Sequence, residues 1–335
     1  MKTEVLKKVL IILSPFVVAW FAIFVGTYGV TPVMVLKILV NEIIPLGLNT
    51  DFPEKTIILD IRLPRVILAG LVGIALSGSG VTMQGLFRNP LVDPFILGIS
   101  AGSAFGCAIS VGFFPRLPIQ IMAFIFGIVS VLLTYSLAKT QGEISRLPLI
   151  LSGVIISSFF TALVSVVKFL IDPHRLQSIV FWLMGSFSLA DWKFVKISFI
   201  GIGLSLLPLY LMRWRLNVIS MGENEAKMLG VNVKRDRLIF IVFSTLAVSL
   251  AVSVSGIIGW IGLMVPHLVR MLTGPDHKNL VPLSMAGGAT FMIFADTVAR
   301  SLTSFDIPVG IITALIGAPF FVYIMKKSDK ANWRK

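Results

Sequence analysis

The chain has 335 residues, of which 56% are hydrophobic and only 13% charged, and its mean hydropathy is +0.94. An average soluble protein carries nearly twice that share of charged residues, so the composition excludes an ordinary soluble fold and indicates an integral membrane protein. The formal net charge of +13 would fit a nucleic-acid partner, but the positions of the charges indicate a different cause.

Uncharged runs of about 17 to 25 residues, long enough to cross roughly 30 Å of hydrocarbon as α-helix, recur along the whole chain. They predict about ten transmembrane helices, at residues 9–29, 63–83, 95–113, 117–138, 149–171, 192–212, 238–255, 257–273, 281–300 and 308–325. The eighth run is short and abuts the seventh. We therefore predict an all-α polytopic membrane protein with a single transmembrane domain over residues 1–335.

The first of these runs follows Lys2, Lys7 and Lys8, a pattern that a cleaved signal peptide also has. No small-residue cleavage site follows it, so an uncleaved first span is the favoured interpretation. The single cysteine, Cys107, excludes an intrachain disulfide.

The basic residues are distributed unevenly between the two sides of the predicted topology. An even number of spans puts both termini on one side. If that side is the cytoplasm, its segments hold 19 of the 29 Lys and Arg, whereas the acidic residues divide 8 and 8. The positive-inside rule states that cytoplasmic segments carry an excess of Lys and Arg, whereas acidic residues matter little. We therefore predict cytoplasmic termini, and the basic net charge needs no nucleic-acid partner.

Two segments on the opposite side are long enough for helices of their own. In residues 30–61, TPVMVLKILVNEI predicts a short helix. Residues 172–191 are apolar enough in the middle for a helix that either lies at the membrane interface or dips into the protein.

Small residues suggest where transmembrane helices approach closely. Gly98, Gly102 and Gly106 form a doubled G-x-x-x-G and are expected to pack against another helix. SGSGVTMQGL at 77–86 is weakly similar to SVSGIIGWIGL at 253–263, which is either an inverted repeat of the kind found in transporters or a chance similarity.

Signatures of catalysis and nucleotide binding are absent from the sequence. It contains no G-x-S-x-G and no P-loop, and its three histidines fall in separate segments. We therefore expect no enzymatic activity, no metal and no cofactor in this chain, and any energy for active transport has to come from a partner. Asp296 and Arg300, one turn apart, predict an i,i+4 ion pair that serves either structure or function.

The segment 213–237 carries six Lys or Arg and three acidic residues. Within it, SMGENEAKML predicts a short helix with Gly230 as its C-cap. The segment is either an ordinary basic loop or a docking helix for a soluble ATPase. In the second interpretation, Glu223 and Glu225 lie near the helix start and the small Ala226 fits a groove on the partner.

Motifs along the whole chain resemble the FecCD-type permeases, the membrane subunits of ATP-binding-cassette (ABC) importers for iron siderophores, haem and cobalamin. They are RLPR at 62–65, SGSGVTMQGLFRNPLVDPFILGISAGSAFG at 77–106, GENEAKMLG at 222–230, GWIGLMVPHLVR at 259–270, ADTVARS at 295–301 and DIPVGIITALIGAPFFVYIM at 306–325. The resemblance implies a ten-span subunit in the prokaryotic cell membrane. It also implies three kinds of partner: a second permease protomer, two cytoplasmic ATPases and an external substrate-binding protein.

The resemblance also implies roles for particular residues. Arg62, Arg65 and Arg300 match arginines that dock onto glutamates of the binding protein, through pairs expected to be solvent-exposed at the rim. The cytoplasmic gate would comprise Asn89, Leu91 and, less directly, Arg146 and Leu147, because the SRLP segment at 145–148 departs from the family in length and in Pro148. The ATPase-coupling residues would be Gly222, Glu223, Glu225, Ala226, Leu229 and Gly230.

The function predicted from these observations is ATP-driven import of a metal chelate by alternating access. A siderophore ranks first as substrate, followed by a corrinoid, haem and a molybdate-type oxyanion. The alternative is a stand-alone secondary carrier or channel.

Overall fold

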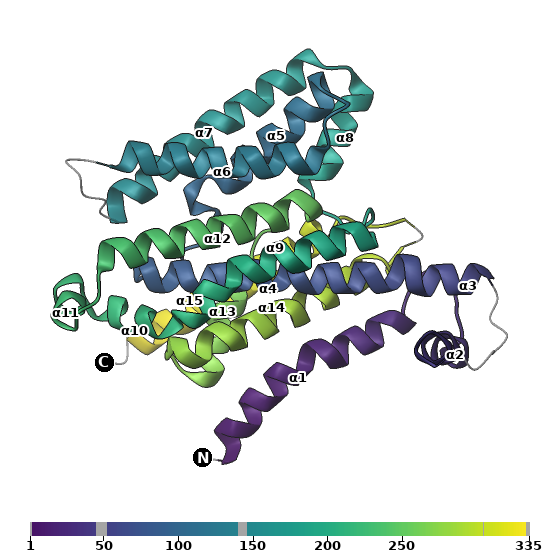
Figure 1. Ribbon diagram of the computed structural model, residues 1–335, viewed down its shortest axis with the longest axis horizontal. Coiled ribbons are helices and arrows are strands. Elements are labelled where there is room, and N and C mark those ends of the chain that lie inside the picture. Colours follow the sequence, from purple (N-terminus) through teal and green to yellow (C-terminus); the bar gives the residue numbers. More distant parts are fainter. Residues whose placement is uncertain (1, 45–51, 140–145, 304, 333–335) are drawn as a thin grey trace.

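The computed structural model of the chain describes residues 2–44, 52–139, 146–303 and 305–332, which form a helical bundle without strands in that part (Figure 1). The elements are α1 Lys2–Phe24, α2 Pro32–Ile43, α3 Phe52–Thr56, the π-helix η1 Ile57–Arg62, α4 Leu63–Phe87, the 3₁₀-helix η2 Pro94–Leu97, α5 Ile99–Phe113, α6 Ile119–Ala138, α7 Arg146–Leu170, α8 Pro173–Leu183, α9 Trp192–Leu211, α10 Arg213–Met221, α11 Glu223–Met228, α12 Val233–Ser255, α13 Ile261–Thr273, α14 His277–Ala299 and α15 Val309–Asn332.

The all-helical prediction is confirmed, and each predicted span overlaps one α-helix; the span 95–113 also includes most of η2. Seven helical stretches in the described part are long and apolar enough to cross a membrane: Thr3–Phe24, Pro53–Phe87, Ile119–Ala138, Arg146–Leu170, Trp192–Leu211, Val233–Ser255 and His277–Ala299. The apolar helices Ile99–Phe113, Ile261–Thr273 and Val309–Tyr323 are shorter. Ten crossings therefore stay a prediction.

Helix α4 forms the centre of the bundle (Figure 1). It packs against α9, α12, α13 and α14, and almost all of its residues are buried. Such contact requires small residues where backbones meet. A Cβ added to Gly73 would lie 2.2 Å from the carbonyl oxygen of Gly288, and one added to Gly80 would lie 2.0 Å from that of Gly262.

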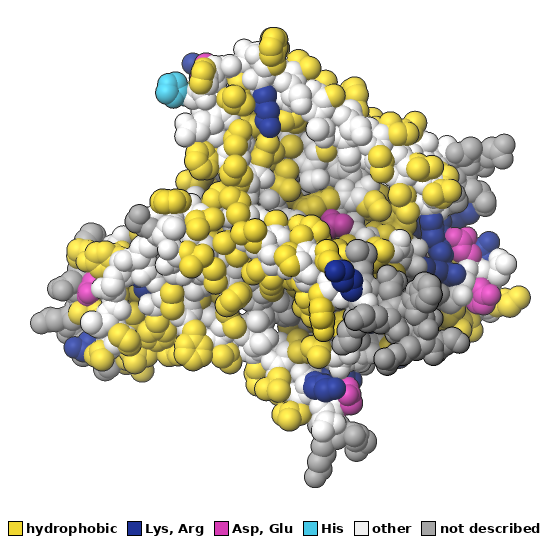
Figure 2. Space-filling model, turned by 180° about the vertical axis from the view of Figure 1, so that it is seen from behind, with side chains coloured by type: hydrophobic (Ala, Val, Ile, Leu, Met, Phe, Trp, Pro, Cys, Tyr) yellow, Lys and Arg dark blue, Asp and Glu magenta, His cyan; other side chains and the backbone are white. Residues whose placement is uncertain are grey.

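A second group of helices, α5 to α8, lies beside this centre, and α1 crosses its opposite flank (Figure 1). Both termini lie toward the end of the bundle that carries α10 and α11, whereas α2 and α3 lie at the other end. Hydrophobic side chains are spread widely over the face seen in Figure 2, as expected of a protein whose surface meets lipid.

The predicted close packing at Gly102 and Gly106 is confirmed. Added Cβ atoms there would lie 2.3 Å from the carbonyl oxygens of Phe126 and Met122 on α6. Gly98 has a different role, because it precedes α5 with a φ of +87°. Its left-handed backbone conformation, rather than helix packing, requires glycine.

We expect Gly106→Ala to lower the free energy of unfolding by about 1–3 kcal/mol, because α5 and α6 would have to move apart. The matched control is Gly203→Ala on α9, where an added Cβ meets nothing within 4 Å. That change should be neutral or stabilising by up to about 1 kcal/mol. Denaturant titration in mixed micelles measures both, and equal effects would contradict the packing argument.

Both short helices predicted outside the spans are present, and their caps explain their limits. Thr31 accepts a hydrogen bond from the backbone N–H of Met34 at the start of α2, which has Pro32 in its first turn. Asp172 caps α8 in the same way, and Pro173 follows it. Proline in the first turn and an oxygen-bearing N-cap are the sequence features that start such helices.

The similar stretches 77–86 and 253–263 have different backbone conformations. The first is helical within α4, whereas residues 256–259 of the second are not helical. The inverted repeat is therefore not confirmed by this pair of segments.

Candidate docking, gating and coupling sites

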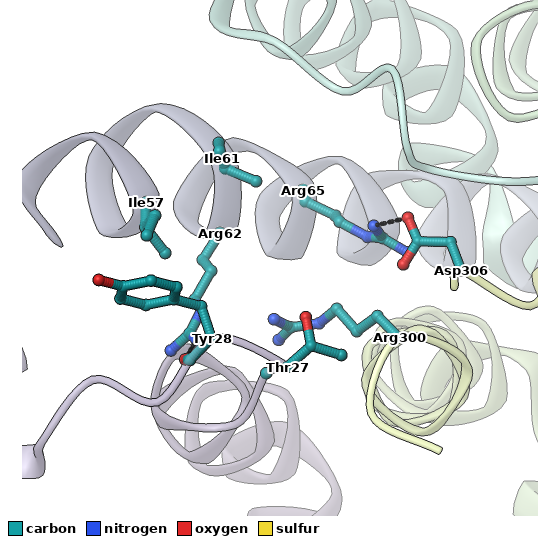
Figure 3. Close-up of a pocket in the computed structure, with 9 residues that line it drawn as sticks. Thr27, Tyr28, Ile57, Ile61, Arg62, Arg65, Arg300 and Asp306 are labelled. Atoms are coloured by element: carbon teal, nitrogen blue, oxygen red, sulfur yellow. Dashed lines mark hydrogen bonds and ion pairs between the residues drawn. The ribbon is translucent and has the colours of Figure 1, made fainter. Parts of the chain in front are cut away.

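A polar cavity of about 230 Å³ opens at the end of the bundle opposite α10 and α11 (Figure 3). It is formed where α1 ends, where η1 leads into α4 and where α14 ends. Its lining residues are Gly26, Thr27, Tyr28, Ile57, Ile61, Arg62, Arg65, Arg300 and Asp306. The structure thus brings the three sequence-predicted docking arginines together from distant parts of the chain.

Two of these arginines hold the end of α1. Arg62 Nη1 donates to the carbonyl of Ile23 at 2.9 Å, and Arg300 Nη2 donates to that of Ala22. The last four carbonyls of a helix have no partner within it and carry partial negative charge, so guanidinium groups stabilise that end. Arg62 Nη2 also donates to the carbonyl of Tyr28, just beyond α1.

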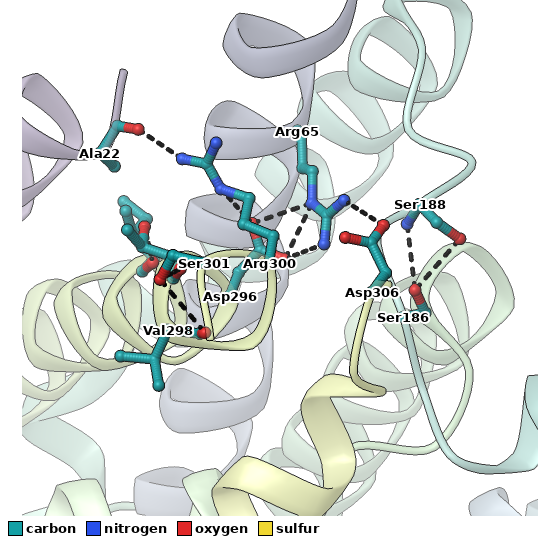
Figure 4. Close-up of polar contacts among 11 residues, drawn as sticks. Ala22, Arg65, Ser186, Ser188, Asp296, Val298, Arg300, Ser301 and Asp306 are labelled. Atoms are coloured by element: carbon teal, nitrogen blue, oxygen red, sulfur yellow. Dashed lines mark hydrogen bonds and ion pairs between the residues drawn. The ribbon is translucent and has the colours of Figure 1, made fainter. Parts of the chain in front are cut away.

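The third arginine, Arg65, is held by two carboxylates (Figure 4). Its Nε lies 3.0 and 3.1 Å from the two carboxylate oxygens of Asp296, and its Nη2 lies 2.9 Å from one of them. Its Nη1 donates to Asp306 Oδ2 at 2.7 Å. The predicted Asp296–Arg300 pair is present at 3.7 Å, but Arg65 is the closer partner of Asp296.

The predicted solvent exposure of the three arginines is wrong. Arg62, Arg65 and Arg300 keep only 3%, 6% and 6% of their surface exposed. Arg62 is buried because it caps α1, and Arg65 because it compensates the buried Asp296. Arg300 does both. Their role in docking stays a prediction.

The cluster nevertheless carries excess positive charge toward the cavity. Among its described residues, three guanidinium groups meet two carboxylates, Asp296 and Asp306. Arg62 donates only to backbone carbonyls in the hydrogen bonds seen there. A carboxylate entering the cavity would therefore meet unbalanced guanidinium charge, the arrangement that binds carboxylates most specifically.

The predicted gate residues lie at two helix ends, one pair just after α4 and the other in the first turn of α7. Asn89 and Leu91 form an exposed turn after α4, in which Asn89 Oδ1 accepts the backbone N–H of Leu91 at 2.9 Å. Arg146 and Leu147 begin α7, and Ser145 of the same motif lies outside the described residues. Helix α7 packs on η2, which follows the first turn. None of these contacts tests gating.

The coupling segment contains two helices rather than the one that was predicted. The expected helix over SMGENEAKML is interrupted at Gly222, which is extended and separates α10 from the six-residue α11. Gly230 does close α11 as predicted, with a φ of +75°. The hydrogen bonds Gly230 N to Lys227 O and Val231 N to Ala226 O, both 3.0 Å, complete a Schellman motif.

The interpretation of Ala226 as a contact with a partner is wrong. Its side chain is fully buried inside the segment, so a bulky residue there would disrupt the segment itself. The most exposed apolar side chains of this segment are instead Met221 at 64%, Met228 at 87% and Leu229 at 61%. Neither methionine was among the coupling residues predicted from the sequence. An apolar residue among charged ones was a usable signal of a contact with a partner.

Ion pairs hold the coupling segment against α12. Arg215 Nη1 lies 2.8 Å from the buried carboxylate of Asp236, and Arg237 pairs with Glu223. Burial would raise the pKa of Glu223, but the hydrogen bond and charge of Arg237 outweigh it and lower that pKa. The stabilisation by this pair is therefore complete above the ordinary glutamate pKa and is lost as the pH falls through the lowered one.

Comparisons with known proteins agree with this architecture. Residues 12–327 match the model of the FecCD transport family. A Helicobacter pylori protein named probable iron chelatin transport system permease is 47% identical over 269 residues, which are 80% of this chain and 82% of the relative. The molybdate import system permease protein MolB of Haemophilus influenzae is 43% identical over 84% of this chain and 85% of its own.

A solved structure supports the same relationship. An inward-facing conformation of a metal-chelate type ABC transporter aligns with a TM-score of 0.81 and 38% identity, over 95% of this chain and 97% of that one.

Proposed function

Since this chain belongs to the FecCD transport family, whose members are transport permeases rather than enzymes, we propose that it is the permease subunit of an ABC importer for a metal chelate. The observation that carries the proposal is the likeness, along nearly the whole chain, to a metal-chelate type ABC transporter. The protein is a multi-pass membrane protein, and we place it in a prokaryotic cell membrane with both termini in the cytoplasm.

An iron chelate of the siderophore type is the substrate we propose first. The similarity to an iron chelatin permease supports this choice, and the similarity to a molybdate permease keeps an oxyanion among the candidates. A corrinoid or haem would be handled by the same architecture. In this family the external binding protein selects the substrate, so ligand binding by that partner is the decisive measurement.

The proposed assembly has two permease protomers, two cytoplasmic ATPases and one external binding protein. ATP is bound by the ATPases, and their closure moves the coupling segment 213–237. The pathway between protomers then changes its open side. Asn89, Leu91, Arg146 and Leu147 would narrow its cytoplasmic end, and a carboxylate of the binding protein would enter the cavity of Arg62, Arg65 and Arg300.

The ATPase would dock on the exposed apolar side chains of α11 and the residue after it. Met228 and Leu229 project from a segment otherwise rich in charge, and methionine is enriched at protein interfaces, whose buried cores are depleted of charge. When the ATPase displaces these side chains, the ion pairs between the segment and α12 would transmit the displacement to the bundle.

We expect Met228→Asp to weaken ATPase association about tenfold or more, because a carboxylate would be buried in an apolar contact. The side chain is almost fully exposed, so the bundle itself should fold normally. The matched control is Leu189→Asp, at another highly exposed apolar position, which lies between α8 and α9. Copurification of the ATPase measures both, and full retention by the Met228 variant would remove this contact from the interface.

The proposed function is tested by uptake into proteoliposomes that contain the permease, its ATPase and its binding protein. Uptake should stop when ATP is withheld while ion gradients are kept constant. The alternative, a stand-alone secondary carrier or channel, predicts uptake that follows the ion gradient without the ATPase.

A further inference from the structure

Helix α4 ends in a turn that normally requires glycine. The backbone N–H of Asn89 donates to Gln84 O at 3.1 Å, and that of Arg88 donates to Gly85 O at 3.3 Å. These are the two hydrogen bonds of a Schellman motif, and they place Arg88 at its left-handed position with a φ of +52°. Helix α11 closes with the same motif and uses Gly230 there.

An arginine in this conformation is uncommon, so its side chain is where a reason should be sought. The guanidinium of Arg88 reaches the coupling segment, where Nε and Nη2 both donate to the carbonyl of Ile219, at 3.0 and 2.7 Å. Ile219 lies in the last turn of α10, whose carbonyls have no partner within the helix. A cation at this end of a helix also stabilises its dipole.

Arg88 therefore belongs to two sites at once. Its backbone forms the turn that continues into Asn89 and Leu91, and its side chain holds the end of α10 directly before Gly222 and α11. Helix α10 also packs directly against α4. The turn formed by residues 88–91 is called the gate turn below. A displacement of α10 would move the Arg88 guanidinium, and through it the backbone of the gate turn.

Resting on the proposed function, we propose that Arg88 is the positioning residue that transmits ATPase-driven motion from the coupling segment to the gate turn at Asn89 and Leu91. It touches no substrate. It links two segments that are separated by 131 positions in the sequence through one side chain, which makes two hydrogen bonds to one carbonyl oxygen.

Three substitutions separate transmission from a merely structural role. Arg88→Gly removes the guanidinium and suits the left-handed backbone, so the turn should be at least as stable as in the wild type. Arg88→Ala removes the same group but keeps the unfavourable backbone demand. Arg88→Lys keeps a charge without the two-pronged geometry. Alanine meets the same backbone cost as the wild-type arginine, and only glycine relieves it. A merely structural role therefore predicts that the loss follows stability and is smaller in the Gly variant than in the Ala variant, whereas transmission predicts that Gly and Ala are equally defective.

The measurement uses the full permease with its ATPase in nanodiscs, with a fluorophore on Leu91→Cys. The only native cysteine, Cys107, is fully buried, so the label is specific to the gate turn. ATP should change the label's signal in the wild-type background. In Arg88→Gly and Arg88→Ala we expect this response, and the import per ATP hydrolysed, to fall about tenfold, with an intermediate loss in Arg88→Lys. ATP hydrolysis should continue in all three.

Arg175→Ala is the matched control. Arg175 Nη1 donates to the carbonyl of Gly112 at 2.7 Å near the end of α5, so the same kind of contact is removed away from the gate turn. An ATP response in Arg88→Gly as large as that of unmodified Arg88 would overturn the inference. So would the absence of any ATP-dependent change in the label's signal when Arg88 is unmodified. The label's response to ATP needs no substrate, so it tests transmission by Arg88 separately from the proposed function. The proposed function fails if uptake by the wild type is independent of ATP.

Discussion

Replacing Asp296 with alanine is expected to lower the free energy of unfolding by about 3–5 kcal/mol, because it leaves the buried Arg65 without its principal counter-charge. Asp296 is 1% exposed and meets both Nε and Nη2 of Arg65. Arg300, with its Nε at 3.7 Å, would lose the same carboxylate. Denaturant titration of the purified protein in mixed micelles gives the value.

Asp306→Ala is the matched control for that measurement. The Asp306 carboxylate contacts the same arginine at 2.7 Å, but its side chain is 39% exposed, so its loss should cost no more than about 1 kcal/mol. The double variant Arg65→Met with Asp296→Leu should recover part of the loss, because no unpaired charge is left at that position. Equal, small effects of the two aspartate variants would contradict a structural role for the buried pair.

Placing a carboxylate at the mouth of the arginine cavity should block import. Thr27 is exposed and lies beside Arg300 in Figure 3. In Thr27→Glu the new carboxylate would pair with the guanidinium groups of the cavity, which we propose bind a carboxylate of the binding protein. We expect roughly tenfold or greater slowing of binding-protein association, and a matching loss of import, because steering by charge acts on the encounter rate.

Thr27→Gln is the control, since it has the same shape without the charge. It should bind and import as the wild type does. Raising the salt concentration should slow docking of the wild type more than docking of Thr27→Glu. If the Glu and Gln variants import equally well, the cavity is not the docking site and its arginines serve only to hold α1, α4 and α14 together.

Most of the fold could be predicted from the sequence because hydrocarbon imposes a simple requirement. A helix that crosses it needs a long apolar run, and such runs are visible without knowledge of tertiary contacts. Local caps such as Thr31 and Asp172 are visible in the sequence too, although α2 and α8 were predicted from their apolar stretches alone. The doubled glycine motif at Gly102 and Gly106 is also a local signal.

The burial of the arginines could not be predicted in this way. The carbonyls that Arg62 and Arg300 bind belong to Ile23 and Ala22, and a backbone carbonyl has no signature in the sequence. Asp306 was a visible residue, but nothing local indicates that it faces Arg65 across 241 positions. Ala226 illustrates the same limit, because a small side chain fits an external groove and an internal contact equally well.

The capping of α1 has a consequence for how the protein is made. Arg300 is 278 positions downstream of Ala22, so at about 5–20 residues per second the ribosome reaches it on the order of tens of seconds after the first span has left the tunnel. During that time the first span can be inserted in the membrane, but of the two arginines that cap its end only Arg62 has been made. The N-terminal helix is thus locked in place near the end of synthesis, and chains interrupted before Arg300 would carry a loosely attached first span that membrane quality-control proteases could recognise.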